Sequence, residues 1–378
     1  MKFKKYIVID GYLGLGNIGD EASFEVIYDR EVGKDSSNEI VAASYVLPYS
    51  TARMFGVEGI KDGLINLRFY YVLLRAKKLI YAGGGRYGLQ TIRMMCLLSL
   101  IAKLFRTEVH WEGVGIYDYN WDGSSQTIWD HSTIKVHFLD KFIIKLTMKF
   151  VNSVSVRDTY SYNFLNKISN SRKVEEINDL VTGLKIHKSS KEWDKNFHEP
   201  LHRFKVGISI RTMKATMVNS FISELTTLVI DLIRNGMEVV FVPFGNPEEA
   251  HNEFDDDKII AIIAIKEISK RGYVDNEDYS KHVHLFSNPL KPSRLLSLIS
   301  TFDFFICFRF HSIVFSDIAA IPYAAIIYDT KSQQYILRQK SPYLKLATHL
   351  QTIDWKGIRN AIKVEFENKQ SIYSKKPL

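Results

Sequence analysis

The sequence predicts an α/β protein of two domains, each a parallel sheet with helices on both faces. Strand-like runs rich in β-branched and aromatic residues alternate with amphipathic segments of helix length along the 378-residue chain. They fall into two sets, separated by a polar stretch with few aliphatic side chains at residues 187–203. We therefore expect two doubly wound domains joined by a linker, and two such sheets usually face each other across a cleft.

The first set predicts an N-terminal domain over residues 1–186. Several of its strand-like runs stop at glycine or aspartate, as strands do where they enter loops. The segment 94–105, "MMCLLSLIAKLF", is interrupted by Lys103 and is shorter than the roughly 18 apolar residues of a membrane span, so we expect a buried or surface-docked helix. The expected strands are 6–10, 39–47, 78–85, 107–116 and 153–158, with helices at 22–32 and 94–105.

The second set predicts a C-terminal domain over residues 204–350, followed by a helix and tail at 351–378. The alternation of strands and helices repeats that of the first set. The acidic run "HNEFDDDK", residues 251–258, is typical of an exposed loop rather than a metal site. The expected strands are 204–211, 238–245, 282–287, 302–310 and 322–329, with helices at 219–236, 293–301 and 355–368.

The composition is that of a globular protein in a reducing compartment. Hydrophobic residues make up 46% of the chain and charged residues 24%. The N-terminus passes directly into a strand-like run without the pattern of a signal peptide. Cys96 and Cys307 lie far apart in apolar runs, so we expect both to be reduced core residues, and no Cys/His cluster has zinc spacing. We expect a cytoplasmic protein without a metal, and a position at the inner face of the membrane stays open.

The formal net charge of +8 fits a solvated basic surface or an anionic partner. The lysines and arginines are scattered and no nucleic-acid motif occurs, so a nucleic-acid partner is not expected. An acidic small substrate or an anionic lipid surface is the better interpretation. The oligomeric state is not predicted.

The stretch "VIDGYLGLGNIGDEA", residues 8–22, has the G-x-G-x-x-G spelling of a dinucleotide-binding turn at Gly14, Gly16 and Gly19. An NAD site also needs an acidic residue at the end of the second strand, and "AASYVLPYS" has none there. NAD is therefore disfavoured. The turn instead predicts a close backbone approach before a helix N-terminus, which suits an anion or a sugar hydroxyl.

Three polar residues, Asn17, Asp20 and Glu21, lie in and just after this turn. Asp20 is suited to cap the helix that follows, because a short carboxylate side chain accepts from first-turn amides. It is equally suited to orient a substrate hydroxyl. Both interpretations stay open.

Two further strand ends in the first domain carry candidate ligand contacts. "YAGGGRYG" places Gly84, Gly85 and Arg86 after a strand, where glycines let the backbone approach a ligand or a neighbouring strand. "SVSVRD" places Arg157 at another strand end, as an ion-pair partner or a ligand contact. Asp158, next to it, is a candidate N-cap.

Basic residues mark the strand ends of the second domain. Arg211 ends "GISIR", Arg309 and His311 lie in "ICFRFH", and Lys331 follows the last expected strand. Two arginines and a helix N-terminus form a natural cradle for a phosphate or carboxylate. A lone histidine is usually structural, but one beside an arginine at a strand-to-helix turn can transfer a proton near neutral pH.

In this order, "GYLGLGNIGDEA", "YAGGG", "VSVRD", "GISIR" and "FRFHSIVFSDIAAIPYAAIIYDTK" resemble the polysaccharide pyruvyl transferase family, over about residues 8–335. The resemblance implies a GT-B-like fold of two Rossmann-like domains facing a cleft. It also implies transfer of the enolpyruvyl carbons of phosphoenolpyruvate to two sugar hydroxyls, giving a cyclic pyruvate ketal and phosphate. The partners are then phosphoenolpyruvate, as a co-substrate with no further cofactor, and a glycan or lipid-linked sugar.

By this resemblance, Arg309-Phe310-His311 matches the family's Arg-Leu-His element, and Arg211 matches the arginine after the first strand of the second domain. These positions imply phosphoenolpyruvate binding, with His311 as the candidate acid. Phe310 replaces the usual leucine, which affects the shape of the pocket. The charge of Lys331 complements the same anionic donor.

On the acceptor side, Asp20 or Glu21 is expected to orient or deprotonate the sugar hydroxyl, beside Gly16 and Asn17. Residues 111–138 match no element of the family, so the acceptor sugar and the ketal positions are not predicted. Two alternatives stay open: a GT-B-type glycosyltransferase that uses a nucleotide sugar, and a non-catalytic relative that binds a sugar or an anion.

Overall fold

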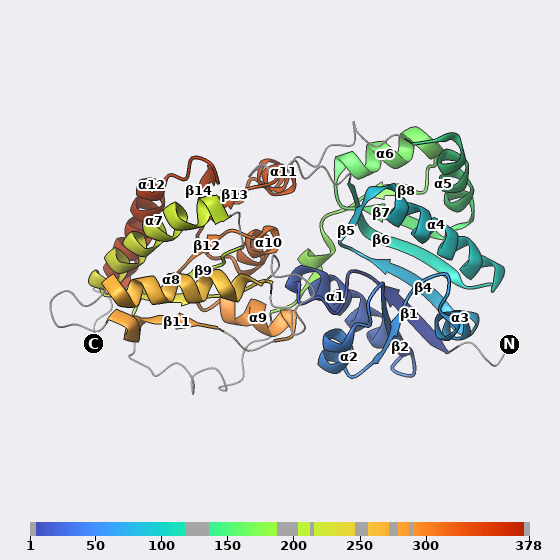
Figure 1. Ribbon diagram of the computed structural model, residues 1–378, viewed down its shortest axis with the longest axis horizontal. Coiled ribbons are helices and arrows are strands. Elements are labelled where there is room, and N and C mark those ends of the chain that lie inside the picture. The colour runs from blue at the N-terminus through green and yellow to red at the C-terminus, as the bar shows by residue number, and fades with distance from the viewer. Residues whose placement is uncertain are drawn as a thin grey trace. The chain divides into compact units, whose positions relative to one another are not determined.

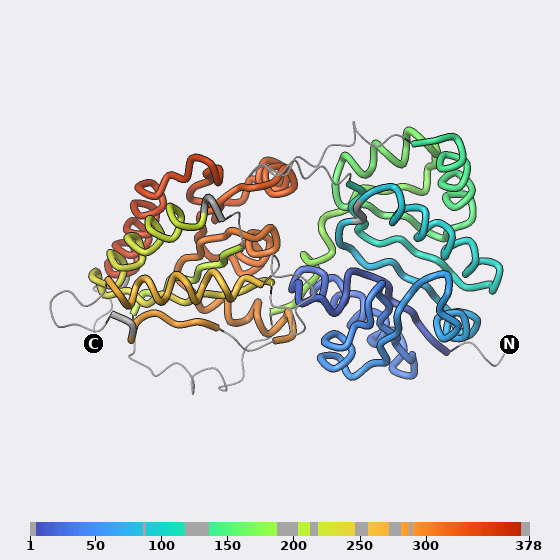
Figure 2. Tube along the Cα trace, in the orientation of Figure 1, coloured from blue at the N-terminus to red at the C-terminus, as the bar shows by residue number. Residues whose placement is uncertain are grey.

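The computed structural model describes residues 5–117, 136–186, 203–211, 215–245, 256–271, 279–286 and 290–373. The chain divides into two compact units, one ending at Leu184 and the other beginning at Lys185. We call them unit 1 and unit 2. Figure 1 labels their elements, and Figure 2 traces the chain from unit 1, in blue to green, into unit 2, in yellow to red. Of the predicted linker, residues 187–202 lie outside the described residues.

Unit 1 has an eight-stranded sheet within its described residues, and every pairing in it is parallel. The strand order is β3–β2–β1–β4–β6–β7–β8, with β5 paired to β6. The order reverses between β1 and β4, and ligands of such sheets bind at the carboxyl ends of the strands at this switch point. The strands are β1 (Tyr6–Asp10), β2 (Glu39–Ser44), β3 (Glu58–Lys61), β4 (Ala76–Ala82), β5 (Gly85–Tyr87), β6 (Glu108–Tyr117), β7 (Ser153–Val156) and β8 (Val174–Glu176).

Helices cover both faces of this sheet. In β1, Ile7 and Ile9 enter one core, whereas Tyr6 and Val8 enter the other, as a pleated strand buried on both sides requires. The first core is closed by α1 (Ile18–Lys34), α2 (Tyr49–Phe55) and the 3-10 helix η1 (Leu180–Gly183). The second is closed by α3 (Leu67–Leu74), α4 (Gly88–Leu104), α5 (Phe138–Phe150) and α6 (Thr159–Ser169).

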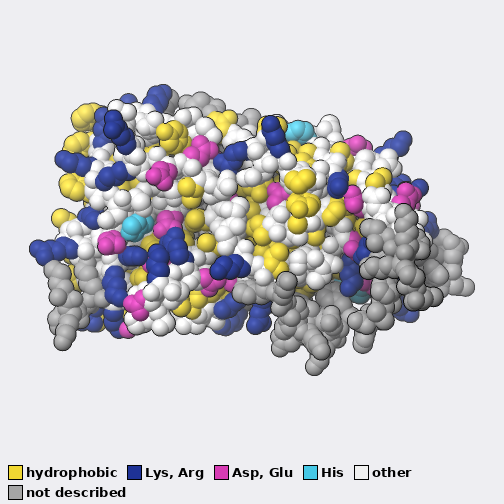
Figure 3. All heavy atoms as spheres, turned by 180° about the vertical axis from the view of Figure 1, so that it is seen from behind, with side chains coloured by type: hydrophobic (Ala, Val, Ile, Leu, Met, Phe, Trp, Pro, Cys, Tyr) yellow, Lys and Arg dark blue, Asp and Glu magenta, His cyan; other side chains and the backbone are white. Residues whose placement is uncertain are grey.

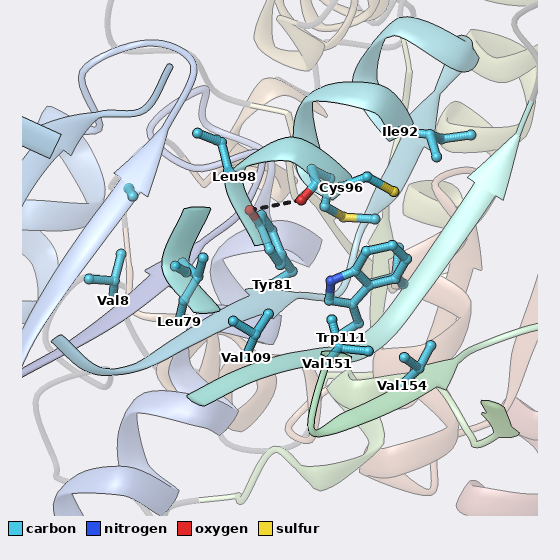
Figure 4. Packing of buried hydrophobic residues seen from close by; sticks show 14 of the residues in the cluster. Val8, Leu79, Tyr81, Ile92, Cys96, Leu98, Val109, Trp111, Val151 and Val154 are labelled. Atoms are coloured by element: carbon cyan, nitrogen blue, oxygen red, sulfur yellow. Dashed lines mark hydrogen bonds between the residues drawn. The ribbon is translucent and has the colours of Figure 1, made fainter. Parts of the chain in front are cut away.

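Figure 4 shows the larger core of unit 1, in which side chains from β4 and β6 meet α4. Trp111 is fully buried, and its Nε1 donates to Ser99 Oγ at 3.1 Å. Tyr81 Oη donates to the Met95 carbonyl at 3.3 Å. Cys96 is a free, buried cysteine in this core, as predicted, and the predicted helix 94–105 is the second half of α4.

Unit 2 repeats this topology. Its described residues form a six-stranded parallel sheet in the order β11–β10–β9–β12–β13–β14, which reverses between β9 and β12. The strands are β9 (Lys205–Ile208), β10 (Glu238–Phe241), β11 (Val283–Leu285), β12 (Phe304–Cys307), β13 (Tyr323–Ile327) and β14 (Leu344–His349). The prediction of two α/β domains with parallel sheets is confirmed.

The helices of unit 2 also divide between the two faces of the sheet. One face packs against α7 (Ala215–Arg234), α8 (Asp257–Arg271) and α12 (Trp355–Tyr373). On the other side, α10 (Phe310–Ala319) packs against β12, β13 and α9 (Pro292–Ile299), and α11 (Thr330–Gln339) follows β13. The 3-10 helix η3 (Tyr279–His282) precedes β11. Among the described helices, none combines the length and the apolar character needed to cross a membrane.

Candidate functional site

Four of the predicted site residues of unit 2 come together at the carboxyl ends of neighbouring strands. Arg211 follows β9, Arg309 and His311 follow β12, and Lys331 lies in the first turn of α11 after β13. The backbone N–H of Arg309 donates to Ser209 Oγ at 3.4 Å, which joins the segments after β9 and β12. These two strands flank the switch point of the sheet, where ligands are expected.

The Arg309 side chain is held by Asp257, the first residue of α8. Arg309 Nε lies 3.1 and 3.0 Å from the two carboxylate oxygens of Asp257, and Nη2 lies 2.5 Å from Oδ1. The backbone N–H groups of Phe244 and Gly245 also donate to Asp257, at 3.1 and 2.6 Å. Burial raises the pKa of Asp257, while the Arg309 guanidinium and the Gly245 amide oppose that rise. The pair fixes the orientation of Arg309 and offsets part of its charge.

The prediction of an exposed acidic loop at residues 251–258 is wrong for Asp257, which is buried. Residues 251–255 lie outside the described residues. Asp256 accepts from the backbone N–H of Lys258 at 2.9 Å, and Asp257 begins a helix. The helix starts within a run of three aspartates, so the sequence does not distinguish its first residue from the two before it. The buried residues of α8 that follow at helical spacing were the available signal: Ile260, Ala261, Ala264 and Ile268.

Arg211 and Lys331 each lie near an aromatic ring. The Arg211 guanidinium carbon is 4.3 Å from the ring centroid of Tyr328, and Lys331 Nζ is 5.9 Å from that of Phe310. Lys331 Nζ also lies 3.8 Å from Asp329 Oδ2. Cation–π contacts of this kind restrict a long basic side chain without removing its charge. The edge of the sheet therefore presents three cations in restrained positions.

His311 is the second residue of α10. Its ring lies 4.9 Å from the Phe310 ring, edge to face, and the Phe310 ring packs in the same way on Tyr335 at 5.5 Å. Arg309 is the N-cap residue of α10 and makes no side-chain cap hydrogen bond. The first-turn N–H groups of this helix thus add positive potential beside the three cations. An anion fits this arrangement, with an imidazole next to it that can transfer a proton.

In unit 1 the glycine turn joins β1 to α1 at the switch point of the sheet. Gly14 and Gly16 have φ angles of +79° and +74°, which glycine adopts without strain. A Cβ on Gly14 would lie 2.5 Å from Pro48 Cα, so the segment after β2 packs directly on the turn. Asn17, and not Asp20, is the N-cap of α1, since its side chain accepts from the Gly19 N–H at 3.2 Å.

Asp20 is buried beside the second glycine cluster. Asn17 Nδ2 donates to Asp20 Oδ2 at 2.6 Å. A Cβ on Gly84 would lie 2.6 Å from Asp20 Oδ1, so the backbone after β4 passes close to this carboxylate. The structure therefore brings Asp20, Asn17 and Gly84 together at the switch point.

Glu21 is also buried, and its carboxylate is part of the framework of the turn. The Gly14 N–H donates to Glu21 Oε1 at 2.9 Å, and Thr51 Oγ1 donates to both carboxylate oxygens at 2.8 Å. Two carboxylates in the first turn offset the positive end of α1. The turn is therefore better suited to a neutral hydroxyl than to an anion.

The other predicted site residues of unit 1 lie in β5 or directly after β7. Gly85 begins β5, and the Arg86 side chain lies outside the described residues, as do residues 118–135 of the unmatched stretch. Arg157 follows β7, two strands from β4 in the sheet. Its Nη1 donates to Asp179 at 3.1 Å and its Nε to Tyr117 Oη at 3.3 Å, and all three side chains are buried. The structure thus gives Arg157 an ion-pair partner within unit 1.

Tyrosines that sequence-based prediction did not single out follow β1 and β2. The rings of Tyr12 and Tyr45 lie 5.5 Å apart, and Tyr45 and Tyr49 are exposed. They lie at the carboxyl ends of the strands, beside the glycine turn. Open aromatic faces are suited to the C–H faces of a sugar ring. The available signal was tyrosine in the loops directly after two strands, "GYLGLG" and "SYVLPYS".

Comparisons with known proteins identify the family and the fold of the chain. A model of the family described as polysaccharide pyruvyl transferase matches residues 17–330. No curated protein sequence matches the chain. Similar solved structures include the UDP-GlcNAc 2-epimerase from Neisseria meningitidis bound to UDP-GlcNAc, at 12% identity and a TM-score of 0.57 over 97% of this chain and 92% of that one. Another is the UDP-GlcNAc 2-epimerase from Methanocaldococcus jannaschii, at 9% identity and a TM-score of 0.55 over 96% and 92%. At these identities the likeness shows the fold, which is GT-B-like.

Proposed function

The chain belongs to the polysaccharide pyruvyl transferase family, and from this premise we propose that it transfers the enolpyruvyl group of phosphoenolpyruvate to a sugar of a surface glycan or lipid-linked oligosaccharide. Two sugar hydroxyls bond to the central carbon of the donor and lose their protons, while the bond from that carbon to the phosphate oxygen breaks. One proton is gained by the methylene, and the other leaves with the phosphate. The products are a cyclic pyruvate ketal and inorganic phosphate. The atoms balance without an oxidant or reductant.

The observation that carries the proposal is the cationic edge of unit 2. Phosphoenolpyruvate has a phosphate and a carboxylate, and Arg211, Arg309 and Lys331 follow three neighbouring strands, β9, β12 and β13. Since Asp257 offsets part of the charge of Arg309, we assign the stronger anion contacts to Arg211, Lys331 and the N-terminus of α10. Arg309 then helps to position the donor as well as to neutralise its charge.

We assign His311 as the acid that protonates the donor methylene. Protonation makes the central carbon electron-poor and open to attack by a hydroxyl. An imidazole is suited to this step because it exchanges a proton near neutral pH. The edge contact with Phe310 restrains the ring beside the anion site.

The acceptor sugar is assigned to the switch point of unit 1. Asp20 is the candidate that orients or deprotonates its hydroxyl, with Gly16 and Asn17 in the adjoining turn. Glu21 is given a supporting role, because its carboxylate already accepts hydrogen bonds from backbone and side chain within the turn. The exposed tyrosines beside the turn support this assignment, since they offer stacking surface for sugar rings.

The test is phosphate release from phosphoenolpyruvate in the presence of a panel of glycan and lipid-linked acceptors. Arg211→Gln should abolish donor binding in calorimetry. His311→Gln should keep donor binding and lower turnover by about a hundredfold or more. Arg294→Gln, an exposed arginine of α9, is the matched control and should change neither.

The two alternatives give different results in the same assays. A nucleotide-sugar glycosyltransferase would bind UDP and not phosphoenolpyruvate. A non-catalytic relative would bind its ligand and release no phosphate with any acceptor. Mass spectrometry of glycans from cells with and without the protein would identify the acceptor, through a gain equal to pyruvate less one water.

A further inference from the structure

Unit 1 carries a helix whose large apolar side chains face solvent. On α5, Phe138, Leu139, Phe142 and Phe150 are 80%, 69%, 56% and 47% exposed. At 3.6 residues per turn, these four fall within about a third of the helix circumference. The opposite side of α5 packs into the core through Ile144 and other buried residues. Large apolar side chains gathered on one exposed side of a helix are typical of an interaction site.

Lysines border this stripe on the same helix. Lys141 and Lys145 are exposed on the adjacent side of α5, and Lys149 is exposed beside Phe150, with its Nζ 5.9 Å from the centroid of that ring. The one carboxylate in the helix, Asp140, is buried and lies 2.5 Å from Arg93 of α4. The exposed surface of α5 is therefore apolar and positive.

The two helices that contact α5 extend this charge. α4 and α6 flank it in unit 1, and neither contains an aspartate or glutamate. Between Gly88 and Ser169 the three helices hold six basic residues and one carboxylate, namely Arg93, Lys103, Lys141, Lys145, Lys149 and Lys167 against Asp140. Figure 3 shows hydrophobic and basic side chains mixed at the edge of unit 1 that carries α5, at the upper left.

We propose that this face, α5 with its flanking lysines, docks on an anionic lipid surface. Helices that lie in a membrane interface sink their apolar side chains into the boundary between headgroups and acyl chains. Lysine side chains beside them extend to the headgroup phosphates. A second copy of the same face would oppose lysine to lysine across a two-fold interface, so charge favours lipid over self-association.

The start of α5 lies toward the carboxyl ends of the strands in unit 1. Asn152, two residues after the helix, is hydrogen-bonded to Val109 near the amino end of β6. The most exposed residues, Phe138 and Leu139, therefore lie at the same edge of the sheet as the glycine turn. Docking would bring that edge to the membrane, where lipid-linked sugars are held. This last consequence rests on the proposed function, whereas the docking itself does not.

The experiment is sedimentation of the full-length protein with vesicles of phosphatidylcholine alone or mixed with phosphatidylglycerol, neither of which carries a glycan. We expect binding to the anionic vesicles that weakens as salt is raised. Phe138→Ser with Phe142→Ser should lower the affinity about tenfold or more, and so should Lys141, Lys145 and Lys149 changed together to Gln. Thermal unfolding of both variants should match the parent protein, because these side chains are exposed.

Matched control variants replace exposed apolar side chains or lysines that lie outside α5. Ile65→Ser with Leu67→Ser deletes two apolar side chains that are 95% and 83% exposed in unit 1. Changing Lys270, Lys356 and Lys363 to Gln lowers the net charge equally in unit 2. Equal losses in these controls, or equal binding to both vesicle types, would overturn the proposal. So would a dimer, seen without vesicles, that dissociates in the Phe138/Phe142 variant. Loss of binding in the α5 variants alone supports it, whatever the outcome of the phosphate-release assay.

Discussion

The two units share a strand order and carry opposite charges at the same place in it. In unit 1 the loop after β1 leads into Asp20 and Glu21, and in unit 2 the segments after β9 and β12 lead into Arg211 and Arg309. Topology determines where a ligand binds in such a sheet, and the loop residues determine which ligand. The difference teaches that one architecture supplies an acidic edge and a basic edge within a single chain.

A second contrast concerns two ion pairs, one in each unit. Arg157–Asp179 lies in unit 1 with side chains 5% and 4% exposed, away from the switch point. Arg309–Asp257 lies at the switch point of unit 2, with Arg309 14% exposed. We interpret the first pair as structural and the second as a link between stability and donor binding.

The largest expected effect tests this contrast. Asp179→Ala and Asp257→Ala should each lower the free energy of unfolding by about 3 kcal/mol, because Asp179→Ala leaves a buried guanidinium, and Asp257→Ala a half-buried one, without its carboxylate. Urea denaturation followed by circular dichroism measures the loss. Only Asp257→Ala should also weaken phosphoenolpyruvate binding in calorimetry. Equal loss of donor binding in both variants would show that the pairs do not differ in role.

The next effect concerns the stability of unit 1 at low pH, which depends on the carboxylate of Glu31. Glu31 is buried in α1, and Lys34 Nζ and Lys78 Nζ each donate to it at 2.8 Å. Burial raises the pKa of Glu31, but these lysines outweigh that and lower it to about 2, from an ordinary value of 4.5. Because the pKa is lower in the folded state, the carboxylate stabilises unit 1 fully above pH 4.5. This stabilisation, up to about 3 kcal/mol, is lost as the pH falls toward 2.

Thermal unfolding between pH 7 and pH 3 measures how steeply the stability of the protein falls with pH. Glu31→Gln should make this slope shallower, whereas Glu175→Gln, an exposed glutamate of β8, should leave it unchanged. An unaltered slope in the Glu31 variant would assign the acid sensitivity of unit 1 to other carboxylates.

A smaller effect sharpens the acceptor side of the comparison. Gly84→Ala should destabilise unit 1 by about 2 kcal/mol, because Gly84 has a φ of +71° and its Cβ would meet Asp20. It should also lower acceptor-dependent turnover and leave phosphoenolpyruvate binding unchanged. Gly56→Ala is the matched control, since Gly56 has a φ of +68° and no atom within 4 Å of the new Cβ. If both variants lose turnover alike, contact with Asp20 is not the cause.

The smallest effect separates the two carboxylates of the glycine turn. Glu21→Gln should cost about 1 kcal/mol of stability, through weaker hydrogen bonds from Gly14 and Thr51, and should keep most of the turnover. Urea denaturation and phosphate release measure the two outcomes. A hundredfold loss of turnover without loss of stability would make Glu21, rather than Asp20, the group that acts on the sugar.

Much of the fold was predictable because the central strands are apolar on both faces. The prediction of a strand at residues 6–10 is confirmed by β1, which is buried along its whole length. The edge strands β3 and β14 were not predicted, because β3 is short and both are largely exposed or half-buried on the outer side. The predicted strand 302–310 ran too far, since the apolar residues after β12 turn into α10.

The candidate site was predictable only in part. Four of its residues follow strands closely in the sequence, and they can be predicted from where the strands end: Arg211, Arg309, His311 and Lys331. Asp257 is not found in this way, because it meets Arg309 across 52 positions of the chain. The exposed apolar stripe of α5 likewise depends on which side of the helix is left uncovered, and composition does not determine that.

By itself, the sequence determined the α/β class, the alternation of strands and helices, and the charge type that follows each strand, because burial and turn formation leave local patterns in the chain. The tertiary structure decided that Asn17 caps α1, that Glu21 supports the glycine turn, and that Asp257 holds Arg309. It also decided that α5 exposes phenylalanines beside lysines. These outcomes depend on how elements distant in sequence pack against one another, and local periodicity carries no record of that packing.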